Sequence, residues 1–221
     1  MPNWVENDLY VIGSVKHRRA VEQALVGESG EDIDFNRVVP MPSSFLLSPS
    51  GAANPKEGSD PFSWEWVREL GLSTIDDIEN HIAEKLYSIG VPKHQDLDIS
   101  LFSRTHPRRA EIIDWCQCMG VVLPIKYGHP SWCEWSEQKW GVKWNASQSA
   151  IVQRRHVLKF KFNTPWRAPT RVVVALAKAH PQVTIVMQSF EALMQWQQTL
   201  FVQFGKVVAE EHREYTGPRG G

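Results

Sequence analysis

The chain has 221 residues, of which 42% are hydrophobic and 22% are charged, and its formal net charge is -1. This length is enough for one substantial core or two small ones, and the near-zero charge excludes a general attraction to phosphates or acidic lipids. The first residues lack the basic start and apolar stretch of a signal peptide, and no run approaches the roughly 18 apolar residues of a membrane helix. Three cysteines are too few and too oddly numbered for a disulfide framework. We therefore expect a soluble cytoplasmic protein without membrane attachment.

Residues 1–42 are predicted to form a strand, a helix and a second strand. Apolar residues alternate with other residues over positions 8–13, as in a strand with one buried face. Ser14 can cap a helix with an apolar inner side, and Gly27 can end it. The apolar run IDFNRVV, residues 33–39, is predicted to be the second strand, because the prolines that follow cannot donate to a ladder. The segment is therefore interpreted as one βαβ unit, the first half of a ferredoxin-like domain.

Residues 43–135 are predicted to form a mostly helical insertion. The segment opens with a loop rich in Ser, Pro and Gly. Ser73 and Thr74 each precede an Asp by three residues, and apolar residues then recur at helical spacing. A second helix is predicted from about Pro107 to Met119, where a glycine follows.

Residues 136–214 are predicted to form the second βαβ half and an additional hairpin. In the strand RRHVLKFKFN, alternation places Leu158, Phe160 and Phe162 on a core face and the lysines on the opposite face. A helix opened by a proline and the strand VTIVMQ follow, and FGK then marks a tight turn between two strands. The predicted fold class is α+β, a ferredoxin-like split βαβ sandwich with a helical insertion and a C-terminal β-hairpin. The tail, residues 215–221, is expected to be disordered.

Five sequence phrases resemble a known family. MPNW, NDLYVIG, DFNRVVPMP, KWGVKWNA and FNTPWRAP occur here in the order found in the Api-ninety-two-like family of phage and plasmid proteins, a domain of unknown function. The resemblance covers roughly residues 1–42 and 132–190, and the last forty residues depart from the family's Tyr, Glu and Gly-rich pattern. It implies a partly ferredoxin-like fold and an accessory protein of a mobile element, located in the cytoplasm of the host cell. It implies no particular activity.

Half of the chain's ten tryptophans fall between residues 132 and 166. In the architectural interpretation, Trp140, Trp144 and Trp166 bury their indoles and hold the KWGVKWNA turn against the sheet. In the functional interpretation they form a stacking or interface surface, because tryptophan and arginine dominate interaction hot spots and Lys143 and Arg167 lie beside them. The architectural interpretation is preferred, and the exposure of the side chains decides between the two.

Two residue sets offer potential metal ligands. Cys116, Cys118, His129 and Cys133 are chemically adequate for zinc, but a CxC pair on a helix directs its thiols about 200° apart. We therefore expect free thiols and no bound metal or cofactor.

His94, Asp96 and Asp98 alternate and would share one face of a strand, either as a metal or acid/base set or as a solvated edge. No catalytic motif such as GxSxG, HExxH or a phosphate-binding glycine loop occurs in the sequence. We expect no enzyme activity and name no catalytic residues.

A basic strip is the candidate for nucleic-acid binding. If Phe160 and Phe162 lie in the core, the residues left to contact phosphates are cationic, namely Arg154, Arg155, Lys159 and Lys161. An ordinary solvated strand face explains the same pattern.

The preferred hypothesis is a non-enzymatic phage accessory protein that binds a macromolecule, most plausibly a host or defence-system protein, through the helical insertion or the tryptophan-bearing face. The alternatives are an RNA or single-stranded DNA binder that uses the basic strip, and a metal-dependent hydrolase built on His94, Asp96 and Asp98. The sequence leaves the oligomeric state open.

Overall fold

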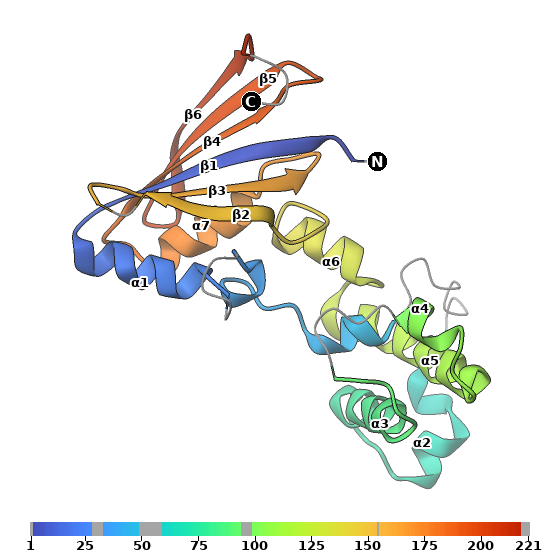
Figure 1. The fold of residues 1–221 in the computed structure, drawn as a ribbon. Helices are drawn as coiled ribbons and strands as arrows, with labels where there is room; N and C mark the ends of the chain where they lie inside the picture. The colour runs from blue at the N-terminus through green and yellow to red at the C-terminus, as the bar shows by residue number, and fades with distance from the viewer. Residues whose placement is uncertain (1, 28–32, 49–58, 94–98, 154, 218–221) are drawn as a thin grey trace. The chain divides into compact units, whose positions relative to one another are not determined.

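The structure is a computed structural model that describes residues 2–27, 33–48, 59–93, 99–153 and 155–217 (Figure 1). The chain forms two compact units. Unit 1 contains Met1–Pro40 and Ser136–Gly221, and unit 2 contains Met41–Trp135.

Unit 1 is built on a six-stranded antiparallel sheet with the strand order β2-β3-β1-β4-β5-β6. Helices α1 (Val15–Leu25) and α7 (Thr170–Ala179) lie against one face of it (Figure 1). The strands are β1 (Trp4–Ile12), β2 (Ser147–Gln153), β3 (Leu158–Pro165), β4 (Thr184–Glu191), β5 (Trp196–Gln203) and β6 (Lys206–Glu214). The units β1-α1-β2 and β3-α7-β4 interleave in the sheet, and β5 and β6 extend it as a hairpin. The predicted α+β class with a C-terminal hairpin is confirmed.

The predicted strand over residues 33–39 is wrong. Ile33 forms one isolated bridge with Val26, and a 3-10 turn, η1 (Phe35–Arg37), follows. Side chains satisfy the backbone donors of this segment, because the carboxylate of Asp34 accepts from Asn36 N–H at 2.9 Å and Asn145 Oδ1 accepts from Phe35 N–H at 2.8 Å. The backbone of this segment therefore does not need hydrogen bonds to a neighbouring strand. The first βαβ unit is instead completed by β2, after the insertion.

The two faces of the sheet differ in burial, as the alternation of apolar and charged residues in β3 predicts. In β3, Leu158, Phe160 and Phe162 are buried beneath the helices. Lys159 and Lys161 lie on the opposite, open face, as predicted.

Unit 2 is helical in its described part. It contains α2 (Glu65–Glu69), α3 (Ile75–Ser88), α4 (Ile99–Ser103), α5 (Arg109–Tyr127) and the 3-10 turns η2 (Ser43–Leu47) and η3 (Pro61–Ser63), and α6 (Trp132–Lys139) begins within it. No helix among the described residues combines the length and apolar character needed to cross a membrane.

One helix boundary in unit 2 confirms the sequence prediction and one corrects it. Thr74 and Asp77 form a reciprocal capping box at the start of α3. The predicted end of the second helix at Met119 is wrong, because α5 continues to Tyr127 and ends at Gly128, which has a φ of 75°. Glycine inside a helix costs only about 1 kcal/mol, and the last two turns of α5 bury Val122 and Leu123.

A buried charge cluster joins α3 to α5. Glu79 is 3% exposed, and its carboxylate accepts hydrogen bonds from the ammonium of Lys126 and, at 2.8 Å, from the hydroxyl of Tyr127. Burial disfavours the charge of Lys126, but hydrogen bonds to Asp76 and Glu79 outweigh burial and raise the pKa of the ammonium. The cost of burying each polar group in the cluster is therefore offset by its hydrogen bonds to the others.

Removing the buried carboxylate should destabilise unit 2. We expect Glu79→Ala to lower the free energy of unfolding by about 3 kcal/mol, because Lys126 and Tyr127 lose an acceptor that water cannot fully replace. Denaturant titration measures the change. Glu84→Ala on the exposed side of α3 is the control, and equal losses in the two variants would show that the cluster contributes nothing.

Candidate functional site

Trp140 is architectural. Its side chain is buried, its indole N–H donates to Val39 O at 2.9 Å, and its ring meets Phe35 edge-on at a centroid distance of 5.9 Å. This is the geometry expected of a buried tryptophan whose polar atom needs a partner.

Trp144 and Trp166 lie at the surface, where Trp4 joins them. The three side chains are 42% (Trp4), 37% (Trp144) and 45% (Trp166) exposed. Ring centroids are 6.2 Å apart between Trp4 and Trp144 and 5.5 Å apart between Trp144 and Trp166. We call these three residues the indole ladder. The preferred architectural interpretation therefore applies to Trp140 and does not describe Trp144 or Trp166.

The ladder assembles from three distant chain segments. Trp4 begins β1 and lies opposite Pro165 in the register with β3, which brings it beside Trp166 at the following position. Trp144 comes from the segment that enters β2. Trp4 is not among the partner-binding residues predicted from the sequence, although alternation along β1 puts it on the same face as Glu6 and Asp8.

The turn that carries Trp166 is strained. Trp166 has a φ of 59°, a conformation that bulky residues rarely adopt and that costs about 1–3 kcal/mol. Two backbone hydrogen bonds hold the turn, from Trp166 N–H to Asn3 O at 2.8 Å and from Arg167 N–H to Pro165 O at 2.7 Å. As a result Trp166 and Arg167 are both exposed at the same turn.

A buried polar network supports this turn from below. The amide of Asn7 donates to Thr164 Oγ1 at 2.8 Å, and the hydroxyl of Thr164 donates to Arg167 O at 2.7 Å. On the other side, Ser189 Oγ donates to Asn7 Oδ1 at 2.7 Å. The side chains of β1, β3 and β4 thus fix the carbonyl of the residue that follows Trp166.

A groove opens beside the ladder. It consists of a hollow of about 560 Å³ and an adjoining one of about 270 Å³, which share Glu137, Gly141, Trp166 and Arg167. The larger hollow is also lined by residues of α7, β5 and β6, among them Arg171, Trp196, Gln198 and His212. The smaller is also lined by Lys143. We call the two hollows together the basic groove.

The cations of the groove are held in different ways. The Lys143 ammonium lies 5.8 Å from the centre of the Trp144 ring, within reach of a cation–π interaction. Arg171 donates to the backbone carbonyl of Gln138. Arg167 is exposed. Of the five residues predicted for partner binding, the structure therefore brings together Lys143, Trp144, Trp166 and Arg167 and places Trp140 in the core.

The two described lysines of the predicted basic strip share one carboxylate partner. Lys159 Nζ lies 2.8 Å and Lys161 Nζ lies 3.8 Å from carboxylate oxygens of Asp8. Arg155 is exposed, and Arg154 lies outside the described residues.

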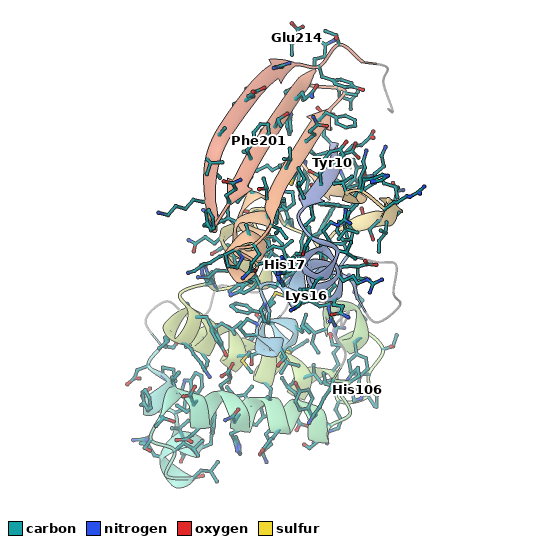
Figure 2. The ribbon with its side chains drawn as sticks, turned by 90° about the vertical axis from the view of Figure 1, so that its left-hand side faces the viewer. Tyr10, Lys16, His17, His106, Phe201 and Glu214 are labelled. Carbon is teal, nitrogen blue, oxygen red and sulfur yellow. The ribbon has the colours of Figure 1, made fainter. Side chains whose placement is uncertain are left out.

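The open face also carries aromatic side chains. Across the sheet, Tyr10 lies opposite Val186, which lies opposite Phe201, and all three are half-buried (Figure 2). Exposed aromatics on such a face are typical of RNA-binding sheets. Here, however, Glu6 and Asp8 share the face and oppose phosphate binding.

The candidate metal ligands do not converge in the described part of the chain. Within that part, no group of three or more His, Cys, Asp or Glu side chains is placed to hold a metal ion. Burial raises the pKa of the Cys116 thiol to about 12 and that of Cys118 to about 11, so both free side chains are neutral thiols near pH 7. His94, Asp96 and Asp98 lie outside the described residues.

Comparison with known proteins identifies the fold. No protein-family model matches the sequence, and no curated protein does. The crystal structure of the protein api92 from Yersinia pseudotuberculosis, described with the family model DUF1281, matches with a TM-score of 0.51. This chain shares its fold with api92. The alignment covers 99% of this chain and 100% of api92 at 14% sequence identity, so the likeness concerns the fold alone.

The two kinds of tryptophan should respond differently to truncation. We expect Trp140→Ala to lower the free energy of unfolding by about 3–5 kcal/mol, because it leaves a cavity and an unpaired carbonyl at Val39. Trp144→Ala should cost only about 1 kcal/mol, because the side chain is already partly solvated. Denaturant titration of both variants measures the difference, and equal losses would mean that Trp144 is a core residue.

The strained turn should depend on one hydroxyl group. We expect Thr164→Val to lower the free energy of unfolding by about 1–2 kcal/mol and to speed hydrogen exchange of the Trp166 amide, because Arg167 O loses its donor. The control is Thr199→Val, at a buried threonine of β5. Unchanged exchange at Trp166 would show that the network does not hold the turn.

Proposed function

We propose that this chain is a non-enzymatic accessory protein that binds another protein through the indole ladder. The observation that carries the proposal is the contact of three exposed tryptophans at one surface. Exposed indoles bury a large area on binding at low conformational cost, and tryptophan and arginine are the residues most enriched at hot spots. Arg167 and Lys143 beside the ladder supply the charged rim that such interfaces use.

The backbone at two positions of the ladder is fixed before any partner binds. The Asn7 network fixes the turn of Trp166, and the strand register fixes Trp4 beside it. A preorganised surface loses less conformational entropy on binding, so its contacts convert more fully into affinity. This favours recognition by a fixed surface, and strained backbone of the kind found at Trp166 is common at binding sites.

The biological setting belongs to the same proposal. The sequence motifs resemble Api-ninety-two-like proteins of phages and plasmids, and the fold is that of api92. We propose a mobile-element protein that acts in the host cytoplasm on a host or defence-system protein. Binding of RNA or single-stranded DNA is the less favoured function, because Asp8 pairs with the two described lysines of the basic strip.

Loss of the ladder should abolish partner capture. The tagged protein and a Trp4→Ala plus Trp144→Ala variant are expressed in cells that carry the source element, and co-purifying proteins are quantified by mass spectrometry. We expect the variant to lose at least about tenfold of a specific partner, as hot-spot truncations do, while keeping its far-ultraviolet circular dichroism spectrum. Phe204→Asn, at an exposed aromatic in the β5–β6 turn, is the control.

A different outcome would contradict protein binding. If the captured material is RNA or single-stranded DNA, if its binding falls steeply with salt, and if Lys159→Ala plus Lys161→Ala removes it, the chain is a nucleic-acid binder.

A further inference from the structure

We infer that the basic groove binds an acidic peptide segment of the protein partner. This inference rests on the proposed function and names the chemistry of the segment that lies next to the ladder. Three of the lining side chains are cationic, Lys143, Arg167 and Arg171, whereas Glu137 is the one acidic side chain that lines the described hollows. The lining of the groove therefore carries an excess of positive charge, although the net charge of the whole chain is -1.

The two arginines suit carboxylates in particular. A guanidinium group presents paired N–H donors that match both oxygens of a carboxylate. Arg171 is oriented by its bond to the carbonyl of Gln138, and Arg167 follows the fixed turn of Trp166. The Arg171 side chain is therefore oriented before a ligand binds, whereas at Arg167 the backbone position is fixed.

The start of α7 adds to the positive potential. Thr170 and Arg171, its first two residues, line the larger hollow. The first turn contains no acidic residue, and no side chain caps it. The positive end of the helix is thus not neutralised within its own first turn.

The walls of the groove can also hold an apolar side chain. Trp166 and Trp196 both line the larger hollow, and Trp166 belongs to the ladder as well. Because the hollows share four residues, a short extended segment can place carboxylates at the arginines and an apolar side chain against the indoles. The volume of about 560 Å³ is sufficient for a few residues.

The surroundings favour a peptide over a nucleic acid. Glu137 lies within the groove, and β6 brings further acidic groups to its rim: Glu210 bonds to Gln198 and His212, and Glu214 lies opposite Trp196. Figure 2 marks Glu214 at the end of this strand. A continuous phosphate backbone would be repelled there, whereas a short segment can place its few carboxylates at the cations alone.

The test uses three fluorescein-labelled probes and the full chain. One is a short peptide in which glutamate alternates with leucine and tryptophan, the second replaces each glutamate by lysine, and the third is a short oligothymidylate. Fluorescence anisotropy gives the dissociation constants at two salt concentrations. We expect binding of the acidic peptide alone, weakened by about tenfold or more in Arg167→Ala plus Arg171→Ala.

Matched variants separate recognition from general charge. Arg167→Lys plus Arg171→Lys keeps the charge but loses the paired donors, and we expect intermediate binding. Lys16→Ala plus Arg19→Ala removes two exposed cations of α1 and should leave the affinity unchanged. Circular dichroism confirms that each variant is folded.

Other results would overturn the inference. Equal binding of the lysine peptide, tighter binding of the oligothymidylate, or a loss in the α1 variant equal to that in the groove variant would each exclude specific recognition of an acidic segment. If the acidic peptide fails to bind while partner capture still depends on Trp4 and Trp144, the inference fails and the proposed function stands. If the peptide binds but the Trp4→Ala plus Trp144→Ala variant captures as much partner as the unchanged protein, the proposed function fails instead.

Discussion

The hydrogen-bond network of Asn7 is the constraint on which the candidate site depends. Asn7 lies fully inside the sheet, and its amide connects the side chains of Thr164 and Ser189, so that β1, β3 and β4 share one set of polar contacts. Buried amides and hydroxyls are costly unless paired, and this requirement locks the register of three strands. Because the network ends at the carbonyl of Arg167, the same requirement fixes the turn that exposes Trp166.

The exposure of the ladder tryptophans therefore depends on hydrogen bonds and strand pairing in the core. The indoles of the ladder are held outward by a strained turn, by the strand register and by the segment that enters β2. Trp140, only four positions before Trp144, turns inward to bond Val39 O. One sequence phrase thus contributes one residue to stability and another to the candidate interface. The adjoining groove depends on α7 and on the C-terminal hairpin formed by β5 and β6.

Electrostatic balance distinguishes the surfaces of unit 1. On the open face of the sheet, Asp8 lies close to both Lys159 and Lys161 and offsets part of their positive charge. In the groove on the helix side, Arg167, Arg171 and Lys143 face one glutamate. In the sequence, the basic residues of both surfaces lie close to aromatic residues. The sequence pattern therefore does not distinguish the open face of the sheet from the basic groove. Cross-strand pairing decides which charges are neutralised, and that pairing joins residues about 150 positions apart.

The sequence by itself determined the features whose cause is local. The alternation of β3, the capping box of α3, the two helices of the βαβ units and the tight turn before Lys206 were all predicted, because each is encoded within a few neighbouring residues. The tertiary structure decided the rest. Whether residues 33–39 join a ladder depends on Asn145, which lies far along the chain, and whether α5 ends at its internal glycine depends on what its last turns bury. The exposure of Trp144 and Trp166, and the arrival of Trp4 beside them, follow from long-range pairing, which no local pattern contains.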